Sequence, residues 1–135
     1  MALRFMLLAL LSIIAASASP CEISGVVLKV VDGDTFEIQG FGLVRLADID
    51  SPEMGTIEGV HAREYALENL LGVQVFLDID DRMGRKPDAV TTCVAYLANR
   101  NGTPNLNKNF NKMVVESGFG VVRDDTRNEF DPLKW

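Results

Sequence analysis

The sequence predicts a small, mainly β domain of the α+β class, in which five strands close into a barrel and two or three helices flank it. Short segments rich in β-branched residues alternate with turn residues, and two other segments have helical apolar periodicity. Their order is three strands, a helix, two strands and a helix. A length of 135 residues, less an export segment, favours a single domain.

The first half of the barrel is predicted from β-branched runs and turn residues. Residues 23–31 are largely apolar on both faces, and the turn residues Asp32-Gly33-Asp34 follow them. Residues 35–39 and 43–49 form the next two expected strands. They are joined as a hairpin across Gly40-Phe41-Gly42.

The second half is predicted from one helical stripe, two strands and a further helix. Residues 58–71 carry apolar side chains at helical spacing before Gly72, which predicts a helix that ends there. Residues 73–79 alternate as a strand, 89–98 form another strand, and 107–117 form the second helix. This order of elements is typical of a five-stranded barrel of the oligonucleotide-binding (OB) type.

This order of strands brings two aspartates together. The first strand runs to Asp34, the second runs away and the third returns to Asp50, so both carboxylates are expected at the same end of the sheet. Arg45 lies on the third strand and is expected on the same face as Ala47 and Ile49, from which it would reach into the barrel mouth.

The N-terminus predicts export. Residues 1–18 combine Arg4, an apolar run and the small residues Ala16-Ser17-Ala18, which fit a signal peptide and its cleavage site. The mature domain is then 19–135, in a secreted or cell-envelope location. An uncleaved anchor remains the alternative, because Pro20 lies near the junction, and membrane association is expected only in that case.

Composition limits the partners and the metal chemistry. A formal net charge of −6 gives no strongly basic surface for tight nonspecific binding to duplex DNA. Cys21 and Cys93 either form a disulfide, which export permits, or are separate thiols with Cys93 buried in a strand. Two cysteines and one histidine are too few for a zinc site, and His61 is expected to be a surface side chain.

Two neighbouring segments carry the chemistry, V-D-G-D-T-F (31–36) and V-R-L-A-D-I-D-S-P-E (44–53). Asp34 and Asp50 offer hard oxygen ligands for Ca²⁺ or Mg²⁺, and Glu53 offers a carboxylate that accepts a proton from water. Arg45, with Arg85 further along, offers guanidinium groups for phosphate. Singly, each of these residues also fits a turn, a helix cap, a salt bridge or loop charge. Together they predict metal-assisted cleavage of phosphodiesters.

These segments, followed by G-V-H-A-R-E-Y-A, D-R-M-G-R and M-V-V-E-S-G-F-G, resemble the staphylococcal nuclease (thermonuclease) family over residues 23–123. The resemblance implies that Asp34 and Asp50 ligate Ca²⁺, with Mg²⁺ or another divalent ion as a substitute, and that Ser51 offers its backbone carbonyl. It implies that Glu53 is the general base, and that the two arginines named above bind the phosphate and stabilise the transition state.

The resemblance also implies an activity and a partner. A nuclease of this family is an endonuclease that hydrolyses DNA, RNA or both and leaves 3′-phosphate ends. We expect single-stranded or locally open substrates, a monomer and no obligate protein partner. The chain departs from the family at Met83, where a tyrosine is usual, and in 121–125, which lack tyrosine. Arg123 and Arg127 are therefore either substitute contacts to the nucleic-acid backbone or solvated surface charges.

Two other functions remain open from the sequence. One is a catalytically silent OB-type module that binds nucleic acid, and the other is an exported calcium-binding interaction domain. The presence of Arg45, Glu53 and Arg85 together favours the enzyme over both.

Overall fold

The computed structural model describes residues 21–86 and 88–135. The predicted signal peptide at 1–18, its cleavage and the alternative of an uncleaved anchor lie outside these residues. Within them, every helix is too short or too polar to cross a membrane.

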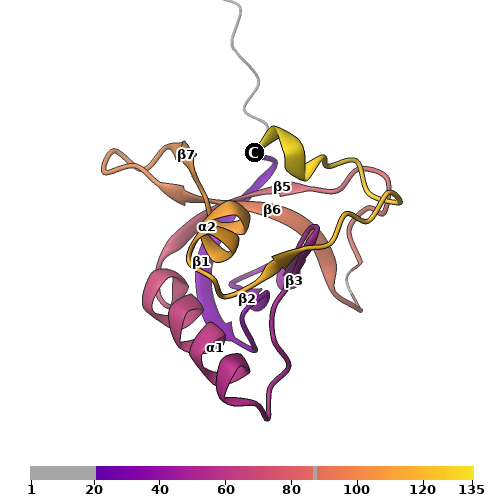
Figure 1. The fold of residues 1–135 in the computed structure, drawn as a ribbon. Helices are drawn as coiled ribbons and strands as arrows, with labels where there is room; N and C mark the ends of the chain where they lie inside the picture. Colours follow the sequence, from indigo (N-terminus) through magenta and orange to yellow (C-terminus); the bar gives the residue numbers. More distant parts are fainter. Residues whose placement is uncertain (1–20, 87) are drawn as a thin grey trace, which may run out of the picture.

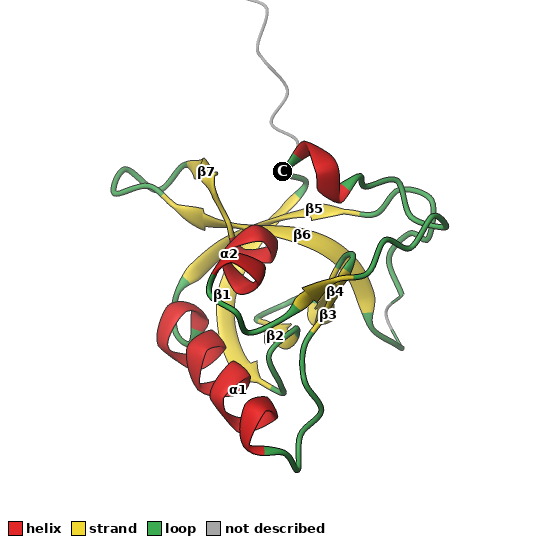
Figure 2. Cartoon of the chain, in the orientation of Figure 1, coloured by secondary structure: helices red, strands yellow, loops and turns green. Residues whose placement is uncertain are grey.

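Five strands form a closed mixed barrel, which confirms the predicted fold class (Figure 1, Figure 2). In chain order the barrel strands are β1 (Ile23–Val30), β2 (Thr35–Ile38), β3 (Gly42–Leu46), β5 (Gln74–Ile79) and β6 (Thr91–Ala98). Neighbours in the order β3, β2, β1, β5 and β6 pair antiparallel. The parallel pairing of β3 with β6 closes the barrel, an architecture consistent with OB-like folds.

Helix α1 (Ile57–Leu70) packs along β1 and covers one side of the barrel, as the apolar stripe predicts (Figure 1). It buries Ala62, Ala66 and Leu70, and the Thr56 side chain caps its N-terminus by accepting a hydrogen bond from the Gly59 amide at 3.0 Å. This cap fixes where the helix starts, with the capping residue three positions after Glu53.

The second helix is shorter than predicted. Residues 104–109 form β7 (Pro104–Asn109), which pairs with β6 and extends beyond the barrel, and α2 (Phe110–Glu116) begins after it (Figure 2). The expectation of helix at 107–109 is therefore wrong. Asn109 ends the strand and caps the helix by accepting from the Lys112 amide at 3.2 Å. The strand is mostly exposed and polar, so it carries no apolar alternation that would predict it.

The predicted third strand is interrupted. Strand β3 ends at Leu46, Asp48 adopts a left-handed conformation with φ of 57°, and β4 (Ile49–Asp50) starts a second small sheet. In β3, Val44 and Leu46 are buried and Arg45 is exposed, yet the following Ala47 and Ile49 are buried.

The expectation that Arg45 shares a face with Ala47 and Ile49 is therefore wrong. The turn at Asp48 breaks the period of two on which that expectation rests. Arg45 lies on the outer face of the barrel and reaches the rim from there.

A C-terminal strap, residues 121–128, crosses this interruption. It begins with β8 (Val121–Val122), which pairs with β4. Asp48 then holds it at three points. The Asp48 carbonyl accepts from the Arg123 amide at 2.8 Å, and its Oδ1 accepts from the Asp125 amide and from Asn128 Nδ2, each at 2.8 Å. A single-turn helix, η1 (Pro132–Lys134), follows the strap.

Asn111 on α2 connects the helix to the barrel. Its side chain is fully buried, with Oδ1 accepting from the Ala95 amide at 3.0 Å and Nδ2 donating to the carbonyls of Ala47 and Cys93 at 3.0 and 3.3 Å. All three contacts join segments distant in sequence. The Asn111 amide thus bonds backbone groups of β6 and of the turn that follows β3, and it ties α2 to both.

The structure answers the question that the sequence left open for Cys93 and confirms the surface position expected for His61. Cys93 is buried in β6 with a free thiol, and burial raises its pKa well above the ordinary range, so it is an inert core group and not a disulfide half. His61 is exposed on α1.

Replacing Asn111 by alanine is expected to destabilise the fold by about 2 to 4 kcal/mol. The change removes three buried hydrogen bonds and leaves the Ala95 amide unsatisfied. Urea denaturation measures the effect. Asn107→Ala, at an exposed position on β7, is the matched control and should stay within about 0.5 kcal/mol of wild type. Equal effects of the two variants would contradict the assigned role.

Asp78 on β5 predicts a pH-dependent loss of stability. Its pKa is raised from 3.8 to about 7, mainly by burial and also by the negative charges of Glu22 and Glu129. Stability from this group is therefore complete below the unfolded pKa and is lost as pH rises through the folded pKa. Asp78→Asn should raise the urea midpoint at about pH 8 and leave it nearly unchanged at about pH 4. The exposed Asp88→Asn should show no such difference, and parallel pH profiles for both variants would refute the prediction.

Candidate metal and phosphate site

The two sequence motifs meet at one rim of the barrel. Asp34 lies in the bend between β1 and β2, where it is buried, and its Oδ2 accepts from the Ser51 amide at 3.1 Å. Its Oδ1 accepts from the Thr35 hydroxyl at 3.0 Å. The turn after β1 and the turn after β4 are thus joined directly, as the strand order predicts.

Gly33 makes this close approach possible. A Cβ at this position would lie 2.8 Å from the Cβ atoms of both Ser51 and Ala62, which is closer than carbon atoms pack. The bend therefore fits between the β4 turn and α1 only because residue 33 has no side chain. That packing holds the Asp34 carboxylate against the Ser51 backbone.

Arg45 lies between the two aspartates. Its Nη2 is 3.7 Å from Asp34 Oδ2 and 3.6 Å from Asp50 Oδ1. Both carboxylates approach the same nitrogen atom, and the arginine side chain is 53% exposed. The rim thus places one cation between two anions, with its outer side open to solvent.

Asp34 is only partly compensated for its burial. The pKa of Asp34 is raised to about 6, because the effects of burial and of Asp32 outweigh the lowering by the Ser51 amide and Arg45. The cost of desolvating the carboxylate therefore exceeds what one amide and one guanidinium return. Additional positive charge at this rim would stabilise the ionised form.

The donor set fits a hard divalent cation that is only partly held by protein. Asp34 and Asp50 supply two anionic oxygen groups, the ligand type that Ca²⁺ and Mg²⁺ prefer. The part of the chain that the structure describes contains no group of three or more histidine, cysteine, aspartate or glutamate side chains arranged around a metal. Water, backbone or substrate oxygens would complete the shell, and the Ser51 carbonyl stays a prediction. A cation here would compete with Arg45 for both carboxylates.

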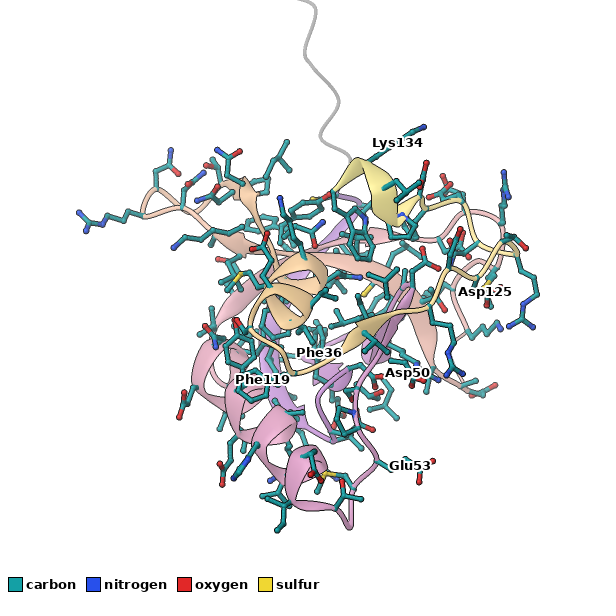
Figure 3. The ribbon with its side chains drawn as sticks, in the orientation of Figure 1. Phe36, Asp50, Glu53, Phe119, Asp125 and Lys134 are labelled. Atoms are coloured by element: carbon teal, nitrogen blue, oxygen red, sulfur yellow. The ribbon has the colours of Figure 1, made fainter. Side chains whose placement is uncertain are left out.

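Glu53 lies beside this cluster but does not join it. It sits in the exposed turn before α1, and its carbonyl accepts from the Thr56 hydroxyl at 2.7 Å. Figure 3 shows its side chain pointing outward from this loop. With Asp50 and Ser51 it lines a surface cavity of about 350 Å³. Of the residues in the Asp34–Arg45–Asp50 cluster, only Asp50 lines this cavity.

Arg85 lies at the other end of the β2–β3 hairpin. Its Nη2 donates to the Phe41 carbonyl at 3.2 Å, and its Cζ lies 4.3 Å from the centre of the Phe41 ring. Phe41 is at the hairpin tip, whereas Arg45 pairs with Thr35 at the opposite end, about 13 Å away along an extended chain. The structure therefore brings Asp34, Arg45, Asp50 and Ser51 together and leaves Arg85 apart.

Arg123 is the site residue that the motifs do not contain. Its Nη2 lies 3.1 Å from Asp50 Oδ2, which is closer than the approach of Arg45 to either aspartate. It follows β8 in the strap, so only the pairing of β8 with β4 brings it to the rim. Sequence spacing gives no warning of that pairing, because β8 has two residues and both are exposed.

A larger cavity of about 590 Å³ opens on the same rim. Arg45, Asp50 and Arg123 line it together with Met83, Thr92 and residues of the strap. Met83 occupies the position at which the staphylococcal nuclease family, which the motifs resemble, usually has tyrosine. No aromatic side chain lines this cavity. The cavity therefore offers guanidinium and hydroxyl groups to a ligand, with little surface for stacking a base.

Comparison of the chain with models of known protein families and with curated proteins found no match.

Calcium is expected to stabilise the wild-type protein and to do so through the two aspartates. Millimolar Ca²⁺ should raise the Tm, because an ion that binds only the folded state stabilises it by mass action. The double variant Asp34→Asn/Asp50→Asn should lose this shift. Thermal denaturation with added Ca²⁺, then with chelator, measures it, and Asp81→Asn/Asp88→Asn is a control with the same charge change. An equal shift in both double variants, or none in wild type, would refute the site.

Proposed function

We propose that this chain is an exported, monomeric, metal-dependent nuclease that hydrolyses phosphodiester bonds of DNA or RNA. The observation that carries the proposal is the rim at which one guanidinium nitrogen of Arg45 contacts the carboxylates of both Asp34 and Asp50. The carboxylates that could ligate a divalent cation and the guanidinium that could bind a phosphate therefore lie together at a solvent-exposed position. The resemblance of the motifs to the staphylococcal nuclease family is the reason for proposing phosphodiester hydrolysis as the reaction.

Arg45 is proposed to bind the scissile phosphate. Its guanidinium is half exposed and already positioned by contacts at 3.6 and 3.7 Å with the two aspartates. A guanidinium offers two parallel N–H donors to a phosphate and strengthens these bonds as negative charge grows on the equatorial oxygens. A divalent cation on Asp34 and Asp50 would supply further neutralisation of that charge.

Glu53 is proposed to accept a proton from the attacking water. Glu53 lines a cavity together with Asp50 and Ser51, and this cavity has room for a water beside a proposed metal ligand. The water oxygen bonds to phosphorus as Glu53 takes the proton, and the bond from phosphorus to the 5′ oxygen breaks. The leaving oxygen takes a proton, so the net change is the addition of one water to give a 3′-phosphate and a 5′-hydroxyl.

Arg85 is proposed to contact the phosphate only after leaving Phe41. Its present contacts are one hydrogen bond and one cation–π interaction, both on an exposed side chain. Such contacts are weak compared with a bidentate guanidinium–phosphate pair, in which both partners are charged. If Arg85 stays at the hairpin tip, the domain fits the alternative of a silent nucleic-acid-binding module better.

Cleavage of single-stranded DNA by the mature chain tests the proposal. We expect cutting with Ca²⁺, none with chelator, and a loss of about 10²-fold or more in Glu53→Gln, because the water then lacks its base. Glu64→Gln, an exposed change on α1, is the matched control and should cut at the wild-type rate. End analysis of the products checks for 3′-phosphate.

Two results would contradict the proposal that this chain is an enzyme. A folded wild-type chain that binds single-stranded DNA without cutting it in Ca²⁺ or Mg²⁺ would establish the silent binding module. A chain that binds Ca²⁺ but not DNA would establish the calcium-binding interaction domain.

A further inference from the structure

We propose that Arg123 forms a second phosphate-binding subsite, next to the one at Arg45, for a neighbouring phosphate of a single nucleic-acid strand. The inference rests on the proposed function and extends it to a residue outside both motifs. It assigns to Arg123, and not to Arg127, the contact with the nucleic-acid backbone.

The first argument is how the two arginines share Asp50. Arg45 contacts Asp50 Oδ1 at 3.6 Å, and Arg123 contacts Oδ2 at 3.1 Å. The guanidinium groups therefore approach opposite oxygens of one carboxylate. Two cationic groups separated by one carboxylate fit two adjacent phosphates of one strand better than they fit a single phosphate.

The second argument is that the backbone of Arg123 is fixed by hydrogen bonds, whereas its guanidinium is exposed and weakly held. The Arg123 amide donates to the Asp48 carbonyl at 2.8 Å and continues the pairing of β8 with β4. A Cβ at Gly120 would lie 2.8 Å from Val114 Cγ1, so the chain packs closely against α2 just before the strap begins. The Arg123 side chain is 77% exposed, and exposed ion pairs are weak. A phosphate can therefore take the guanidinium from Asp50 without moving the backbone.

The third argument separates Arg123 from Arg127, which lines the same 590 Å³ cavity. Arg127 binds Asp125 through Nε and Nη2 at distances down to 2.7 Å, and both residues belong to the strap. The Asp125 carboxylate, two residues before Arg127, therefore balances the charge of Arg127. The partner of Arg123 is Asp50, a proposed metal ligand, so a cation on Asp50 would release Arg123 for phosphate.

The acidic residues around the cavity are consistent with this assignment. Asp125 is neutralised by Arg127, which lowers the pKa of Asp125 to about 2 and keeps that pair ionised. Asp124 also lines the cavity and is exposed. A strand would therefore follow the Arg45 and Arg123 side of the cavity, where the positive charge is.

Binding of a short fluorescein-labelled oligothymidylate with Ca²⁺ tests the subsite. The Glu53→Gln background prevents cleavage, and anisotropy gives the Kd over a range of salt. Arg123→Gln should weaken binding by about tenfold and reduce the slope of log Kd against log salt by about 0.7, the value for one phosphate contact on a single strand. Arg100→Gln, the same charge change at the exposed turn between β6 and β7, should leave the slope unchanged. Arg123→Lys should restore the slope.

Calcium titration of Arg123→Gln by calorimetry separates phosphate binding from a role in placing Asp50. Affinity for Ca²⁺ equal to or tighter than wild type supports the subsite, because Asp50 loses a competing cation. Weaker Ca²⁺ binding, or a salt slope equal to that of Arg100→Gln, would overturn the inference even if the wild-type chain cuts DNA. A wild-type chain that neither binds nor cuts the strand would instead refute the proposed function itself.

Discussion

Asp48 interrupts the third barrel strand with a left-handed backbone, and the candidate site depends on the contacts that it makes there. Its φ of 57° ends β3 and redirects the chain, so that Asp50 turns toward Asp34. Its carbonyl and Oδ1 hold the strap that carries Arg123. Asparagine and aspartate tolerate this conformation better than other residues with a side chain. The same residue thus shapes the rim and attaches a segment 75 or more positions away.

Burying the Asp48 carboxylate costs free energy. Asp48 Oδ2 is buried without a hydrogen-bond partner among the described residues, and burial raises the pKa of Asp48. A buried acceptor left unsatisfied costs about 1 to 3 kcal/mol, whereas each hydrogen bond returns about 1 kcal/mol. The contacts from Asp125 and Asn128 to Oδ1 offset this cost, so the strap and the turn stabilise each other. Asp34 follows the same logic at the site, where its burial exceeds its compensation and favours an added cation.

The sequence was sufficient for the elements with clear periodicity and insufficient where a contact between distant segments decides the structure. The stripe through Ala62, Ala66 and Leu70 predicted α1, and the strand order predicted the meeting of Asp34 with Asp50. The turn at Asp48 was invisible because a local pattern assumes an unbroken strand. Strand β7 is polar and exposed, so nothing in it marks a buried face. Arg123 lies at the site only because the two-residue strands β4 and β8 pair with each other, and sequence patterns do not predict such a pairing.

The separation of Arg85 from the rim bears on how such a site would work. A cation–π contact at an exposed position contributes about 0.5 to 1 kcal/mol, and the hydrogen bond from the Arg85 guanidinium to the Phe41 carbonyl has a charged donor but a neutral acceptor. A guanidinium–phosphate contact has charge on both partners and can place two such bonds in parallel, so it is the stronger interaction. Binding of a phosphodiester would therefore offset the release of Arg85 from Phe41, provided that the loop before β6 can follow. Arg123 needs no such movement, since its guanidinium already lies at Asp50. The chain thus has two arginines positioned at the rim before substrate binds and a third that substrate would have to recruit.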